Sequence, residues 1–156
     1  MKKILHICLI VMLILFPNLT FSVWPYTQNF DGLNTADLTT QDSWSGSVAF
    51  DVQTGVVLEG TKSVEVAVGG DVDINRAVTA STDGIMSFKI RGAVTTLILF
   101  LFIRESTTYK AYIGMDSSGN FELTGTDIAT HSANTTYTVD IEYDVSTDQA
   151  RARVDG

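Results

Sequence analysis

Residues 85–104, IMSFKIRGAVTTLILFLFIR, decide the fold class of this chain. Its first part, Ile85 to Arg91, alternates apolar and polar side chains, which is typical of a strand with one face in solvent. The apolar members of that alternation are Met86, Phe88 and Ile90. The second part, Leu97 to Ile103, is apolar on both faces and too short to cross a membrane. It predicts a central strand covered on both sides.

Shorter alternating runs on either side of this stretch predict further strands. Turn-forming residues separate these runs from one another. The runs are residues 24–30, 47–53, 62–68, 72–78, 109–115, 121–123, 136–145 and 150–154. The run from Thr136 to Val145 is the clearest, and the side chains expected to point inward are Val139, Ile141, Tyr143 and Val145. The polar segment from Gly125 to Asn134 is expected to be a connection. About ten strands without helical periodicity predict an all-β, antiparallel sandwich or barrel.

The amino-terminal segment has the organisation of a secretory signal peptide. Lys2 and Lys3 precede an apolar run of 13 residues, Ile4 to Phe16, and small side chains follow at Thr20 to Ser22. This order predicts cleavage after Ser22, leaving a single domain from Val23 to Gly156 that is secreted or held at the cell surface. An uncleaved anchor is the alternative, but the run is shorter than the roughly 20 residues of a membrane span.

The net charge and the cysteine content limit which partners and which stabilising bonds are expected. The whole chain carries a formal net charge of −8, and loss of the two leader lysines would make the domain more acidic. A nucleic-acid binder needs a basic surface, so that class is excluded. The one cysteine, Cys8, lies within the predicted signal peptide, so packing rather than disulfides must stabilise the domain.

Several segments together resemble bacterial exported domains of the concanavalin A-like, laminin G-like class. They are Phe30–Leu33, Thr39–Gly46, Gly60–Val64, Tyr137–Asp144 and Ala150–Gly156. The resemblance implies a jelly-roll sandwich of two antiparallel sheets, a fold that frequently binds carbohydrate and sometimes holds calcium. It transfers a fold better than a function.

Catalysis is not supported by the residues that could perform it. Glycoside hydrolases of the resembled class carry a Glu-x-Asp-x-Glu strand, but here Thr138 occupies the first position before Asp140 and Glu142. Side chains two apart on a strand also lie roughly 6.6 Å apart, beyond the separation of about 5–5.5 Å that retaining chemistry uses. We therefore interpret Asp140 and Glu142 as a solvated strand face. His131 is expected on the surface, and no nucleophile motif accompanies it.

The sequence leaves open whether calcium binds. Asp71 and Asp73 place two carboxylates on one side of a short strand after Gly69–Gly70. Loop carboxylates that could add oxygen ligands are Asp31, Asp42 and Asp116. Aspartate is equally common in turns for its backbone geometry, so solvated turns are the competing interpretation.

Sugar binding requires exposed aromatic rings with amides and carboxylates nearby. The candidates are Trp44, Tyr109 and Tyr112. Tyr109 and Tyr112 have opposite strand parity, so only one of them can face solvent unless a β-bulge intervenes. A structural role competes with ligand binding for each ring, because large aromatic residues are usually buried.

The function expected from these observations is that of a secreted, non-catalytic binding module, with glycan as the favoured ligand. A structural or adhesive surface protein and a divergent glycoside hydrolase are the alternatives. Asp155–Gly156 is a turn signal that predicts a further strand beyond it. We therefore expect either a longer natural chain or assembly through an open strand edge.

Overall fold

The structure is a computed structural model, which describes residues 27–66, 72–78 and 83–156. Every regular element within these ranges is a β-strand. The strands are β1 (Ser45–Gly46), β2 (Phe50–Gln53), β3 (Ser63–Val66), β4 (Ile74–Asn75), β5 (Asp83–Arg91), β6 (Leu99–Glu105), β7 (Thr108–Met115), β8 (Asn120–Leu123), β9 (Thr126–Thr130), β10 (Thr136–Asp144) and β11 (Gln149–Asp155). No helix in these ranges has the length and apolarity to cross a lipid bilayer. The predicted signal peptide lies outside the described residues.

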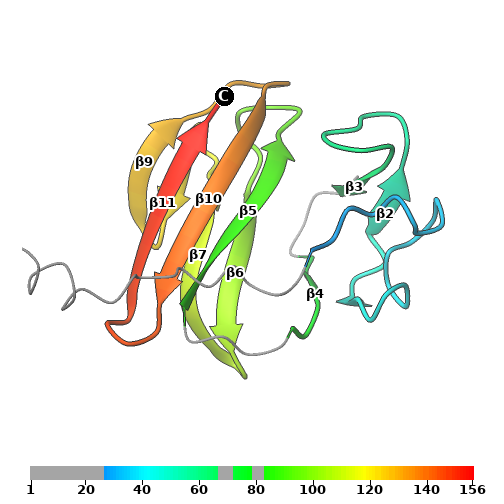
Figure 1. The fold of residues 1–156 in the computed structure, drawn as a ribbon. Helices are drawn as coiled ribbons and strands as arrows, with labels where there is room; N and C mark the ends of the chain where they lie inside the picture. The colour runs from blue at the N-terminus through cyan, green and yellow to red at the C-terminus, as the bar shows by residue number, and fades with distance from the viewer. Residues whose placement is uncertain (1–26, 67–71, 79–82) are drawn as a thin grey trace, which may run out of the picture.

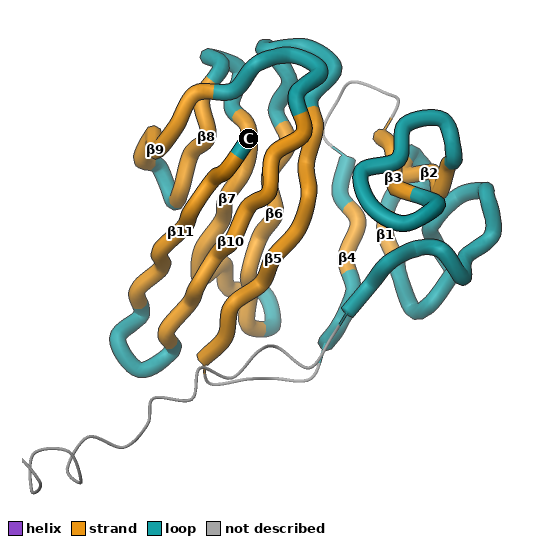
Figure 2. Tube along the Cα trace, turned by 45° about the horizontal axis from the view of Figure 1, so that its top comes forward, coloured by secondary structure: helices purple, strands orange, loops and turns teal. Residues whose placement is uncertain are grey.

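Two antiparallel sheets face each other and form a β-sandwich (Figures 1 and 2). One sheet has the strand order β11-β10-β5, and the other has the order β6-β7-β8-β9. Both sheets contribute to one apolar core, whose buried members are Ile90, Ile103, Ala111, Ile113, Met115, Phe121, Tyr137, Val139, Ile141 and Tyr143. The predicted all-β, antiparallel fold class is confirmed at this level.

Strand pairing follows the alternation in the sequence. In β10, Val139 pairs with Phe88 and Ile141 pairs with Met86, so the apolar side chains of both strands face the same core. The polar residues between them point to the outer face. The inward prediction is wrong only for Val145, which follows the end of β10 and is 50% exposed.

The prediction of a central strand from Leu97 to Ile103 is wrong. β6 begins at Leu99 and pairs only with β7, at the edge of the four-stranded sheet within the described residues. Ile103 is buried in the core, but Phe102 is 47% exposed and Phe100 is half-buried. Among the described residues, no sheet covers Phe100 and Phe102 on the outer face of β6, and composition alone does not distinguish such a strand from a buried one.

The segment that precedes β5 forms smaller sheets beside the sandwich (Figure 1). Leu38 and Val52 are buried there, and the Leu38 amide donates to the Phe50 carbonyl at 2.7 Å. The predicted strand at 24–30 is wrong for residues 27–30, which are irregular, and the strand predicted at 72–78 is reduced to β4. Short strands gain little stability from pairing unless they add to a larger sheet with an apolar face.

The segment predicted as a polar connection contains a strand and a buried histidine. β9 lies within it and pairs with β8, so that prediction is wrong. His131 is 5% exposed, and its ring packs edge-on against Phe121 with 5.8 Å between ring centroids. The prediction of a surface histidine is therefore also wrong. A backbone hydrogen bond explains why His131 is buried. Its amide donates to the Gly119 carbonyl and holds this part of the chain over the end of the sandwich.

Candidate functional site

Four aromatic rings lie together on the outer face of the four-stranded sheet, and we call them the ring cluster. They are Phe100 and Phe102 of β6 and Tyr109 and Tyr112 of β7. Phe102 is central, with ring centroids 4.9 Å from Tyr109 and 5.5 Å from Tyr112, and Phe100 lies 5.2 Å from Tyr112. Tyr109 is 61% exposed and Phe102 is 47% exposed. Large apolar side chains that gather on an exposed face are typical of interaction sites.

A β-bulge places both tyrosines on the same face. Ile103 pairs with Ala111, but Arg104 pairs with Tyr109, so Lys110 has no partner in β6. Tyr109 and Tyr112 are three positions apart, so in a regular strand their side chains would lie on opposite faces. The extra residue shifts the alternation by one position and brings both side chains to the same face. Tyr109 and Tyr112 therefore both flank Phe102, as the sequence allowed only if a bulge intervened.

A glycine in β7 lets the phenylalanine strand approach closely. Gly114 pairs with Phe100, and a Cβ on Gly114 would lie 2.6 Å from the Phe100 Cα and 2.0 Å from the Leu99 carbonyl oxygen. No larger residue fits this position without a backbone shift. The cluster is thus held by strand pairing rather than by loops.

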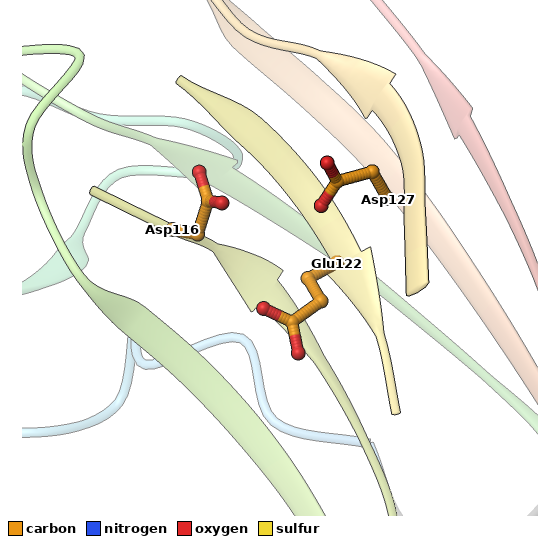
Figure 3. A group of neighbouring side chains, drawn as sticks. All are labelled: Asp116, Glu122 and Asp127. Atoms are coloured by element: carbon orange, nitrogen blue, oxygen red, sulfur yellow. The ribbon is translucent and has the colours of Figure 1, made fainter. Parts of the chain in front are cut away.

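Three carboxylates lie close together, and we call them the acidic corner (Figure 3). Asp116 follows β7, Glu122 belongs to β8 and Asp127 belongs to β9, and one oxygen of each lies within 4.8 Å of the others. A second bulge, at Ile128, lets Asp127 pair with Glu122. Oxygen groups at this spacing could hold a hard cation such as calcium.

Hydrogen bonds fix the acidic corner and join it to the ring cluster. The Tyr112 hydroxyl donates to Glu122 Oε1 at 2.5 Å, and Asn120 Nδ2 donates to Asp127 Oδ2 at 3.1 Å. Asp116 Oδ1 accepts the amides of Ser118 and Asn120. The hydrogen bond to Glu122 raises the pKa of Tyr112 above its usual 10.0, because it favours the protonated hydroxyl that donates it.

The predicted sugar-binding residues have different outcomes. The structure brings Tyr109 and Tyr112 together through Phe102. Trp44 makes none of these ring contacts; its ring packs against Phe30 with 6.3 Å between centroids, in the segment before β5. Trp44 therefore lies apart from the ring cluster.

The predicted calcium residues are dispersed. Asp71 lies outside the described residues, and Asp73 is exposed. Asp42 forms an ion pair with Arg76. Only Asp116, named as a loop carboxylate, lies in a carboxylate group among the described residues.

Asp31 has a structural role instead. Its Oδ1 accepts the amides of Thr61 at 2.8 Å and Lys62 at 3.1 Å. The Thr61 hydrogen bond is the main cause that holds the Asp31 pKa below its ordinary value. This contact joins two of the segments on which the concanavalin A-like resemblance was based.

The strand with Asp140 and Glu142 lies in the other sheet. Both side chains are half-buried and alternate with the core residues of β10, and Asp140 Oδ2 lies 3.8 Å from the Arg153 guanidinium of β11. An ion pair on a sheet face is consistent with the interpretation of these carboxylates as structural surface groups.

Sequence reasoning missed Phe100, Phe102, Glu122 and Asp127. The two phenylalanines were assigned to a buried strand, and Asp127 was assigned to a connection. One signal was present: Arg104 and Glu105 end the apolar run with charges, and Arg104 shares the parity of Phe100 and Phe102. A charge on that parity indicates that the face meets solvent.

Comparisons of this chain with models of known families, with curated proteins and with solved structures found no match.

Proposed function

We propose that this protein is a non-catalytic glycan-binding module and that the ring cluster is its binding surface. The single observation that carries the proposal is the bulge at Lys110, which gathers Tyr109, Phe102 and Tyr112 on one exposed face. Aromatic rings bind the apolar faces of pyranose units, and neighbouring polar groups bind their hydroxyls. Glu122, Asp127 and Asn120 supply such groups at the edge of the cluster.

The tilt of the rings favours a single flexible chain over a flat crystalline surface. Phe102 is inclined by 50° to Tyr109 and by 47° to Tyr112, and Phe100 is inclined by 77° to Tyr112. A flat polysaccharide surface would need coplanar rings to contact several sugars at once. Rings at these angles can instead each contact a different face of a twisted chain.

If the protein is purely structural or adhesive, the outer face that carries the ring cluster has a different role. In that case, the ring cluster would be a contact with another protein, and no glycan would bind. Phe102 and Tyr109 are too exposed to contribute much to the core, so stability does not explain their arrangement. The adjacent hydrogen-bonding groups favour a hydroxyl-rich ligand.

A glycan array with the purified domain, followed by calorimetry on each hit, tests the proposal. Tyr109→Ala should weaken binding about tenfold, roughly 1.4 kcal/mol, because a stacking surface is lost. Tyr109→Phe keeps the ring and should bind nearly as the wild type does. Val48→Ala, at a position 70% exposed outside the sandwich, is the control.

Absence of any glycan hit, or a hit insensitive to Tyr109→Ala, contradicts the proposal. Release of reducing sugar from a bound glycan contradicts its non-catalytic part.

The proposal includes export and a finer fold class. The basic start and short apolar run of residues 1–22 support secretion with cleavage after Ser22. The resemblance to concanavalin A-like domains supports a jelly-roll arrangement of the sandwich. Sugar binding at an outer sheet face agrees with both.

A further inference from the structure

The acidic corner offers open hydrogen-bond acceptors directly beside aromatic rings. Each carboxylate uses one oxygen within the protein: Glu122 Oε1 accepts from Tyr112, Asp127 Oδ2 accepts from Asn120, and Asp116 Oδ1 accepts two backbone amides. Within the described ranges the second oxygen of each carboxylate has no hydrogen-bond donor, and no lysine or arginine pairs with any of the three. Three carboxylates without an ion-pair partner among the described residues therefore lie at the end of the ring cluster, Asp127 exposed and the other two half-buried.

A cation on this face, Arg104, lies at the opposite end of the ring cluster from Glu122. Arg104 pairs with Tyr109 across β6 and β7, so its side chain shares the outer face with Tyr109 and Phe102. Tyr112 and Glu122 lie at the other end, joined by their hydrogen bond. The surface is thus polarised, with rings between one positive group and three negative groups.

This polarity selects among glycans. Uronic or sulfated chains would place their charge against the acidic corner, where like charges repel. A primary ammonium group would donate to the open carboxylate oxygens and would also be attracted to the faces of neighbouring rings. Neutral sugars would gain only the stacking and ordinary hydrogen bonds.

We infer that the ligand is a glycan with free amino groups, such as a chain of glucosamine units, whose ammonium groups bind the acidic corner while its sugar rings stack on the ring cluster. The inference rests on the proposed function and specifies the ligand class of the same surface. The hydrogen bond between Tyr112 and Glu122 connects the two halves, since it fixes the carboxylate next to the ring.

The test compares two oligomers of equal length that differ only at the amine, one of glucosamine and one of N-acetylglucosamine. Calorimetry with the full chain, at a pH where the amines are protonated and with chelator present, should show about tenfold tighter binding of the glucosamine oligomer. The preference should shrink at high salt, because exposed charge pairs are screened. Glu122→Gln combined with Asp127→Asn should abolish the preference and bring the affinities of the two oligomers to the same value. Asp140→Asn, on the other sheet, is the matched control and should retain it.

The outcomes separate this inference from the proposed function. Equal affinity for the two oligomers, or a preference that survives Glu122→Gln with Asp127→Asn, overturns the inference and leaves glycan binding intact. Equally tight binding of a lysine oligomer shows a general cation-binding surface and overturns the inference as well. Binding that appears only when calcium replaces the chelator assigns the acidic corner to a metal ion instead. Loss of glycan binding of every kind contradicts the proposed function itself.

Discussion

Phe121 and Phe102 are chemically identical residues with different surroundings. Phe121 is fully buried between the sheets, against Tyr137 and His131, whereas Phe102 is 47% exposed on the outer face. Phe121→Ala should lower the free energy of unfolding by about 3–5 kcal/mol through lost transfer energy and a cavity. Phe102→Ala should cost about 1 kcal/mol or less, as surface changes usually do. Chemical denaturation of both variants checks this, and equal midpoints would show that β6 is covered in solution. Phe100, half-buried, should fall between them rather than define the core.

Asp144 makes the stability of the domain depend on pH. Its carboxylate accepts hydrogen bonds from Ser146 and Thr147, which lower its pKa from 3.8 to about 2. The charged form is favoured in the folded state, so the stabilisation is complete above the unfolded value and is lost as pH falls through about 2. Asp144→Asn should therefore lower Tm at pH 5 more than at pH 2. Thermal melts at the two pH values measure it, and a Tm difference that stays constant between them would refute the assignment.

At the scale of elements, the β7 bulge accommodates Lys110 as an extra residue while Tyr109 stays on the outer face opposite Arg104. Lys110 is the residue without a partner in β6, so its deletion leaves the pairs Ile103–Ala111 and Arg104–Tyr109 in place. The lost ion pairs of Lys110 with Glu105 and Asp148 are exposed and contribute about 1 kcal/mol or less. The deletion variant should therefore fold and keep glycan binding.

Deletion of Ala111 is the contrasting change in the same strand. It would move Lys110 into the inward position of Ala111, which is 1% exposed. An unpaired buried ammonium should cost about 3–5 kcal/mol or prevent folding. Melting curves and binding of both deletion variants provide the comparison. Equal damage from the two deletions would mean that the bulge is not at Lys110.

At the scale of the whole molecule, export remains a prediction from residues 1–22. Mass spectrometry of protein secreted by an expressing bacterium should find Val23 at the amino terminus, because the apolar run is too short to be retained as a span. A variant with Leu9, Leu13 and Leu15 all changed to Asn interrupts the apolar run; it is the control and should stay unprocessed inside the cell. Recovery of intact Met1 in the membrane fraction would favour the uncleaved anchor.

The sequence by itself determined the fold class and most of the sandwich. Alternation in residues 85–91 and 136–144 identified β5 and β10 and their buried faces, because a period of two places every second side chain on one side. The sequence also identified Tyr109 and Tyr112 as candidate sugar-binding residues, which could share one face only if a β-bulge lay between them. Alternation is a local property, so a local pattern was enough for these elements.

Only the tertiary structure decided which apolar strand faces solvent and which distant residues meet. The run before Arg104 is apolar on both faces, but whether a layer covers it depends on where another sheet lies. Asp116, Glu122 and Asp127 come together because two hairpins and a bulge set their register, and β9 forms because β8 offers it an edge. Strand register is set by pairing with a partner strand, so no single segment of the chain contains that information.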